Sequence, residues 1–194
     1  MSDASARPPP APASLGEIEA AAWRELDAAA GTVAHGWRRM VLATRAGDGA
    51  DARVLVLREC DAAARLLRFY TDARSAKAAQ VVQHARGTLC AWCPVLSWQL
   101  RLRVHLTLHT DGLAVSSRWA RLSVTPAARD YLATAAPGTP VAGGDAAAHV
   151  RPTGRAHFAL LEAQVLAIDW LEIAEAAQHR RAAFDSNGAR WLVP

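Results

Sequence analysis

The stretch Arg53-Val54-Leu55-Val56-Leu57-Arg58 places four aliphatic residues between two arginines. A short run of branched and aliphatic side chains predicts a β-strand. Residues 69–77, with the sequence FYTDARSAK, begin as another strand and pass through a polar turn into a helix. Gln99-Leu100-Arg101 then opens a strand in which apolar and polar residues alternate as far as His109. These three segments predict strands whose ends carry arginine, serine and lysine.

The turn at residues 72–77 has the composition of an anion-binding site. N–H groups at the start of a helix point toward a bound anion, and the helix dipole favours its negative charge. The Ser75 hydroxyl, the Lys77 ammonium and the guanidiniums of Arg53 and Arg74 would converge on it. Lys77 is also the single lysine among 22 basic residues. The sequence therefore predicts a phosphate site, and the alternative is a solvated turn with surface ion pairs.

In this order and spacing, the three segments resemble the FMN-binding split barrels of the pyridoxamine 5′-phosphate oxidase type. The family pattern is an Arg-x-Val-x-Leu-Lys/Arg strand, then Tyr-Thr, a Ser-x-Lys turn, and a strand glutamine that follows an aromatic and proline-rich stretch. Here that stretch is AWCPVLSWQ at residues 91–99. The resemblance spans about residues 37–103 and resumes, more weakly, at residues 158–194.

The resemblance implies a mainly β fold, an antiparallel split barrel with peripheral helices, that binds FMN non-covalently at the interface of a homodimer. It assigns the phosphate to the turn at residues 74–77, the isoalloxazine edge to the strand at residues 53–58 and the Gln99 amide, and the ribityl oxygens to Tyr70 and Thr71. Which of Trp170, Arg180 and Arg181 meets the flavin is left open. The expected cofactor-binding residues are Arg53, Val54, Leu55, Val56, Leu57, Arg58, Tyr70, Thr71, Arg74, Ser75, Lys77, Gln99, Arg101, Trp170 and Arg181.

The sequence also departs from the oxidases proper. Ala76 stands where their turn has arginine, and residues 179–181 do not reproduce the Arg-x-His that grips their substrate. Residues 119–137 hold no match to the Tyr/Arg/Ser set that binds the substrate phosphate. We therefore expect an FMN-dependent oxidoreductase that acts on an unidentified small substrate. The alternatives are pyridoxamine or pyridoxine 5′-phosphate oxidase itself, and a flavin-binding sensor or store without turnover.

Length, composition and charge limit the classes of protein to which the chain can belong. A chain of 194 residues with a mean hydropathy of +0.02 predicts one soluble globular domain. No apolar run approaches the roughly 20 residues of a membrane span, and the N-terminus lacks a secretory signal pattern, so we expect a cytoplasmic protein without a membrane partner. The net charge is +4, but the basic residues are scattered, and the sequence does not indicate nucleic-acid binding.

Local patterns predict a disordered tail at residues 1–13 and a single domain at residues 14–194. Ser14 and Glu17 form a capping box before a helix that ends at Gly31. A loop or lid is expected at residues 136–154. The remaining elements are expected as strands at residues 37–44, 53–59, 66–71, 88–92, 98–109, 158–173, 179–184 and 190–193, and as helices at residues 75–84 and 112–135.

The cysteines and histidines predict no metal site. Cys90 and Cys93 spell C-x-x-C, but they lie in an expected strand, where positions three apart point to opposite faces, so we interpret them as structural thiols. The histidines are dispersed without a metal-binding or hydrolytic motif. His149 and His157 flank the expected lid and are candidate substrate contacts.

Overall fold

The computed structural model describes residues 14–140, 155, 157–173 and 178–194. The helices of these residues are α1 (Leu15–Gly31), α2 (Ala76–Gln83) and α3 (Gly112–Ser123), with 3₁₀ helices η1 (Gly36–Arg38) and η2 (Pro126–Tyr131). The strands are β1 (Arg39–Ala46), β2 (Gly49–Asp61), β3 (Leu66–Asp72), β4 (Arg86–Cys93), β5 (Trp98–His109), β6 (Phe158–Glu172), β7 (Arg180–Asp185) and β8 (Gly188–Leu192). The predicted tail, most of the predicted lid and His149 lie outside the described residues.

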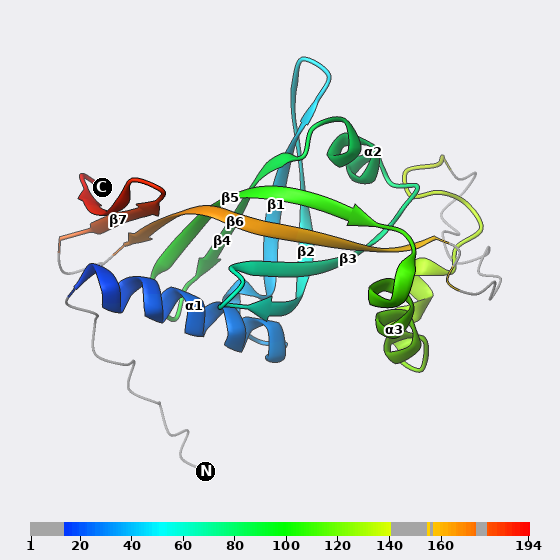
Figure 1. Ribbon diagram of the computed structural model, residues 1–194, viewed down its shortest axis with the longest axis horizontal. Coiled ribbons are helices and arrows are strands. Elements are labelled where there is room, and N and C mark those ends of the chain that lie inside the picture. The colour runs from blue at the N-terminus through cyan, green and yellow to red at the C-terminus, as the bar shows by residue number, and fades with distance from the viewer. Residues whose placement is uncertain (1–13, 141–154, 156, 174–177) are drawn as a thin grey trace, which may run out of the picture.

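The strands form one antiparallel sheet in the order β3-β2-β1-β4-β5-β6-β7-β8, and an additional pairing of β3 with β6 closes the first six strands into a barrel. The long strand β6 makes this closure possible. Its first half pairs with β3, from Phe158 opposite Asp72 to Gln164 opposite Leu66, and its second half pairs with β7. Because β5 follows β6 along its whole length, the barrel splits where β3 gives way to β7 (Figure 1).

The barrel interior is filled by alternate residues of each strand. In β5, Leu100, Leu102, Val104 and Leu106 are buried, while Arg101, Arg103, His105 and Thr107 between them are exposed. This confirms the amphipathic pattern of the sequence. Cys93 is buried, Cys90 is half-buried on the other face of β4, and all three cysteines are free.

Helix α1 packs against the barrel and contributes its apolar face to the main core (Figure 1). Its N-terminus has both bonds of the predicted capping box, because the Ser14 hydroxyl accepts from the Glu17 N–H and the Glu17 carboxylate accepts from the Ser14 N–H. None of the described helices is long and apolar enough to span a membrane.

A second, smaller core lies where α3 and η2 cover the outer face of β3 and β6. Phe158 is its centre, with the rings of Tyr70, Trp119 and Tyr131 packed around it at centroid distances of 5.1 to 5.4 Å. The sequence predicted one helical stretch at residues 112–135. The structure divides it into α3 and η2, because Pro126 begins a new helix and donates no backbone hydrogen bond.

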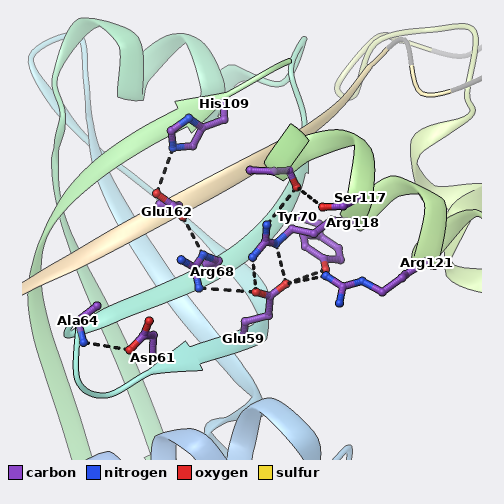
Figure 2. Close-up of polar contacts among 11 residues, drawn as sticks. Glu59, Asp61, Ala64, Arg68, Tyr70, His109, Ser117, Arg118, Arg121 and Glu162 are labelled. Carbon is purple, nitrogen blue, oxygen red and sulfur yellow. Dashed lines mark hydrogen bonds and ion pairs between the residues drawn. The ribbon is translucent and has the colours of Figure 1, made fainter. Parts of the chain in front are cut away.

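Beside this small core, the Glu59 carboxylate ties α3 to the sheet (Figure 2). Arg118 of α3 donates to both Glu59 oxygens, from Nε at 2.7 Å and from Nη2 at 2.6 Å, and the Tyr70 hydroxyl donates at 3.2 Å. Arg68 lies 3.6 Å from Glu59 and donates to Glu162, which also pairs with His109. Burial raises the pKa of Glu59, but the hydrogen bonds from Arg118 and Tyr70 outweigh it and hold that pKa below its ordinary value.

A carboxylate whose pKa is depressed by folding stabilises the folded state above its unfolded pKa, and this contribution is lost as the pH falls through the folded value. We expect Glu59→Gln to lower the free energy of unfolding at pH 7 by about 1–3 kcal/mol, since Arg118 loses its charged partner. The difference between Glu59→Gln and wild type should shrink as the pH falls below the unfolded pKa of about 4.3, and it should vanish only below the lowered pKa of folded Glu59. Urea denaturation at pH 7 and at a series of lower pH values measures it.

A matched control for this prediction is Asp48→Asn, which removes an exposed charge from the β1–β2 turn. We expect it to leave the stability close to wild type. Equal unfolding curves for Glu59→Gln and Asp48→Asn at pH 7 would contradict the role given to Glu59.

Candidate functional site

The turn between β3 and α2 is held by Asp72, the last residue of β3. Its side chain accepts from the Arg74 N–H at 2.8 Å, and its carbonyl accepts from the Ser75 N–H at 3.1 Å and from the Ser75 hydroxyl at 2.7 Å. Ser75 is the N-cap residue of α2, yet its side chain makes no cap hydrogen bond with the helix. In the first turn of α2, the Ala78 N–H donates to the Ser75 carbonyl at 2.9 Å, and the N–H groups of Ala76 and Lys77 are left for another acceptor.

Lys77 reaches back from the first turn of α2 to the end of β3. Its Nζ donates to the Thr71 hydroxyl at 3.2 Å, and that hydroxyl lies 3.4 Å from the hydroxyl of Ser75. Thr71 and Ser75 are both buried. Burial and the nearby charge of Arg53 lower the pKa of Lys77. An ammonium and two hydroxyls therefore converge at the start of a helix.

Arg53 lies next to this group, at the end of β2 that neighbours α2. Its Nη1 donates to the Thr44 hydroxyl at 2.5 Å, and its Nη2 donates to the Gln80 amide oxygen at 2.8 Å. Gln80 stands one helical turn after Lys77, so α2 places both side chains toward Arg53. We call Arg53, Thr71, Ser75 and Lys77 the anion cradle.

The cradle fits a phosphomonoester by its donor chemistry. A phosphate dianion needs several N–H or O–H donors and positive charge, and charge-assisted hydrogen bonds of this kind are the strong ones. Two cations, two hydroxyls and an uncapped helix N-terminus supply both requirements. The cradle residues thus fit the phosphate group of a phosphomonoester ligand.

Arg74 does not join the cradle. Its guanidinium donates to both oxygens of Asp72 and to the carbonyls of Ala133 and Thr134, just after η2. The hydrogen bonds with Asp72 raise the pKa of Arg74, and they hold the pKa of Asp72 below its ordinary value although burial raises it. Arg74 therefore fixes the turn and the end of η2 rather than facing the space between Arg53 and Lys77.

The strand of residues 53–58 divides between the two faces of the sheet. The side chains of Leu55 and Leu57 are buried in the core, so only their backbone is left for a ligand. Val54 is 59% exposed, and Val56 is half-buried on the same outer face. Arg58 lies at a register shift between Leu57 and Glu59, where a β-bulge re-aims the side chain.

The side chain of Arg58 turns toward the small core. Its guanidinium carbon lies 5.4 Å from the centre of the Tyr70 ring, and a hydrogen bond from Arg58 lowers the pKa of Tyr131, which burial nevertheless raises above its ordinary value. The Arg58 Nε is buried without a hydrogen-bond partner among the described residues. Tyr70 and Thr71 are neighbours in the chain but belong to different groups. Thr71 faces the cradle, whereas the Tyr70 hydroxyl donates to Glu59.

A second group of predicted residues lies on the outer face of β5, β6 and β7. Arg101 and Arg181 both donate to Asp169, the latter from Nε at 3.0 Å and Nη2 at 2.8 Å, and Gln99 is half-buried beside them on β5. Burial raises the pKa of Asp169, but the hydrogen bonds from both arginines outweigh it and lower that pKa. The cradle strand β3 pairs with the first half of β6, whereas Asp169 stands in the second half, which pairs with β7, so this group lies away from the cradle along β6.

Trp170 has no exposed surface in this structure. Its ring packs in the core against Trp98 at a centroid distance of 5.3 Å, and Arg180 lies over it at 5.5 Å. The strand alternation explains the position, because Trp170 points inward while its neighbours Asp169 and Leu171 are half-buried on the outer face. The Trp170 ring is thus covered within this chain, and its contact with a flavin stays a prediction.

Two hollows lie on the outer face, between the β1–β2 and β7–β8 hairpins. Their volumes are about 760 and 310 Å³, and both are lined by Thr88, Arg103 and Asp185. The smaller hollow also reaches Arg101 and Asp169, so it borders the second group. Among the described residues, no group of three or more His, Cys, Asp or Glu side chains is arranged to hold a metal ion.

The sequence analysis missed Thr44, Asp51 and Gln80, which all contact Arg53 or one another. Two of them carried a signal. Asp51 stands two residues before Arg53 on one strand face, and Gln80 stands three residues after Lys77 on one helix face. Thr44 lies on a different strand, and only the β1–β2 register places it beside Arg53.

Comparison with known families gives one match over nearly half of the chain. Residues 20–110 match the family model described as pyridoxamine 5′-phosphate oxidase, FMN-binding domain. The matched range includes every cradle residue and ends just after β5. A search of curated proteins gave no match.

Two solved structures share the fold over nearly the whole chain. A pyridoxamine 5′-phosphate oxidase-related, FMN binding protein from Nostoc punctiforme is 24% identical, with a TM-score of 0.66 over 95% of this chain and 100% of that chain. PhzG from Burkholderia lata, solved in complex with tetrahydrophenazine-1-carboxylic acid, is 16% identical, with a TM-score of 0.69 over 94% of each chain. At these identities the likeness shows the fold alone, and it confirms the predicted split barrel.

Proposed function

We propose, from the match of residues 20–110 to the pyridoxamine 5′-phosphate oxidase, FMN-binding domain family model, that this chain binds FMN and carries out redox chemistry on a small molecule. The observation that carries the proposal is the anion cradle at the start of α2, where Lys77, Thr71 and Ser75 converge beside Arg53. FMN supplies two-electron chemistry when it is bound, and the protein supplies binding and orientation.

We further propose that the site is completed by a second copy of the chain. Gln99, Arg101 and Arg181 are expected flavin contacts, yet they lie beside the second half of β6, whereas the cradle strand β3 pairs with its first half. A homodimer that pairs the outer faces of the barrels can bring the cradle of one copy toward this second group on the other. The exposed apolar residues Val41, Val54 and Trp92 on β1, β2 and β4 suit such an interface.

The cytoplasmic location stays a prediction from the sequence, and the sequence does not identify the small substrate. A flavin-binding sensor or store without turnover is the alternative, and the structure gives no specific observation in its favour. An oxygen-consumption assay of the FMN-saturated protein with a panel of small substrates distinguishes the two. Flavin retained without turnover on any substrate would favour the sensor or store.

Lys77→Ala tests the cradle. The change removes one charge-assisted contact, worth roughly 1.5–3 kcal/mol, so FMN affinity should fall at least about tenfold. Riboflavin, which has no phosphate, should bind weakly and equally to both proteins. Titration by quenching of flavin fluorescence measures both affinities.

Arg24→Ala is the control, because it deletes an exposed positive charge on α1 that has no part in the cradle. It should weaken FMN binding much less than Lys77→Ala does. Equal FMN affinities of wild type and Lys77→Ala would refute the cradle as the phosphate site.

Val41→Glu tests the dimer. Val41 lies opposite Val54 on β2 and opposite Cys90 on β4, at the middle of the exposed apolar face, and a standard interface buries roughly 1,600 Å². A carboxylate buried there without a partner should dissociate the subunits and release flavin with them. Light scattering with absorbance detection measures mass and bound flavin together, and Val124→Glu, at an exposed position after α3, is the control.

Pyridoxamine 5′-phosphate should be a poor substrate. Arg181 is paired with Asp169, and the sequence lacks the Arg-x-His that holds this substrate in the oxidases it resembles. Loss of positioning contacts can cost on the order of 100-fold in rate. Formation of pyridoxal 5′-phosphate and hydrogen peroxide in air measures turnover, and a rate at or above about 1 per second would instead support the oxidase itself.

A further inference from the structure

The guanidinium of Arg53 is fully engaged at its two terminal nitrogens. Nη1 donates to the Leu42 carbonyl and to the Thr44 hydroxyl, while Nη2 donates to the Gln80 amide oxygen and pairs with the Asp51 carboxylate at 2.5 Å. Each terminal nitrogen has two hydrogens, so these four partners use all of them. An anion that binds this edge of Arg53 must therefore displace one partner.

The four partners differ in how easily they can be displaced. The Leu42 carbonyl is backbone of β1, and the Thr44 side chain is buried and also donates to Gln80 at 2.7 Å. The Gln80 side chain is held at both ends, because its amide nitrogen donates to Asp51 at 3.1 Å. The Asp51 side chain is 46% exposed, whereas that of Arg53 is 17% exposed. Asp51 is thus the partner on the solvent side.

We infer that Asp51 is an internal counter-anion of the cradle: its carboxylate occupies the solvent-facing side of the Arg53 guanidinium, and a bound phosphate takes that place. Gln80 is a positioning residue, because it keeps the guanidinium oriented when Asp51 leaves. The inference rests on the proposed function, and it makes Asp51 a determinant of the affinity of the cradle for anions.

The local charges support this role. Arg53 and Lys77 are the two cations of the cradle, and both Asp51 and Asp72 act on the charge of Lys77. Asp72 is already neutralised by two hydrogen bonds from Arg74. Asp51 is therefore the carboxylate paired with the cradle cation Arg53, so that its loss should remove a negative charge from beside a bound phosphate dianion. An exposed carboxylate also moves at little cost, since exposed ion pairs contribute little to stability.

The decisive variant is Asp51→Asn, which keeps the size of the side chain and removes its charge. FMN affinity should rise about fivefold, since a nearby like charge is removed from the phosphate. Riboflavin affinity should not change, which separates an effect at the phosphate from a general effect on folding. Asp48→Asn, on the same hairpin but without a contact to Arg53 among the described residues, should bind FMN as wild type does.

Gln80→Ala should change FMN affinity in the opposite direction to Asp51→Asn. Without the amide, Arg53 loses a neutral partner that a phosphate does not replace, so FMN affinity should fall, whereas Gln83→Ala, at an exposed position of the same helix, should leave it unchanged. Unaltered FMN binding by Gln80→Ala would remove the positioning role. If Asp51→Asn does not fold, as judged by circular dichroism, Asp51→Ser is used in its place.

The outcomes separate this inference from the proposed function. If wild type binds FMN and Asp51→Asn binds it equally or more weakly, the inference fails while the proposed function stands. If wild type does not bind FMN, the proposed function fails, and calorimetric titration with inorganic phosphate then tests the cradle directly. Tighter phosphate binding by Asp51→Asn than by wild type supports the inference, and unchanged or undetectable binding overturns it.

Discussion

The pairing of β3 with β6 is the constraint on which the rest of the structure depends. Seven consecutive residue pairs, from Leu66–Gln164 to Asp72–Phe158, turn an open sheet into a barrel. The same pairs fix where β3 ends, and so where the turn at Asp72 and the start of α2 stand. The backbone N–H of Ala73 continues this tie by donating to the His157 carbonyl at 2.8 Å. Closure of the barrel therefore positions the cradle.

The charged side chains on the outer face of the closed barrel form ion pairs with one another. The outer faces of β2, β3 and β6 carry arginines and carboxylates that neutralise one another, as Glu59 and Glu162 do with Arg68 and Arg118. The cradle differs from these networks in degree, because the Asp51 side chain is 46% exposed, against 27% for Glu59 and 22% for Glu162. A reversible anion site requires a partner, here Asp51, that the anion can displace while the other hydrogen bonds of Arg53 stay in place.

The separation of the cradle from Gln99, Arg101 and Arg181 follows from the same topology. A ligand as large as a flavin must contact several strands. The core of a closed barrel is filled by side chains, so such a ligand cannot reach it. Its outer face is then the surface left for the ring system. This is the physical argument for a shared site between two copies, since the apolar part of that face on β1, β2 and β4 is exposed in one copy.

The sequence by itself determined the elements. The alternation of β5 and the capping box of α1 placed these two elements within a few residues, because these signals are local. It also identified Ser75 and Lys77 as candidate anion ligands, since a helix start and a unique lysine are visible along the chain. The β1–β2 hairpin is longer than the sequence predicted. β2 begins at Gly49 rather than at residue 53, because strand pairing extends a strand to its turn.

Only the tertiary structure decided the partners. Arg74 looked like a cradle residue in the sequence, but the packing of η2 beside the turn supplies carbonyls that hold it away. Trp170 looked available to the flavin, but the register of β6 points it into the core. Thr44 entered the site through the β1–β2 ladder, and Arg118 reached Glu59 across 59 residues. Contacts of this kind depend on which faces meet after the barrel closes, and local sequence carries no information about that.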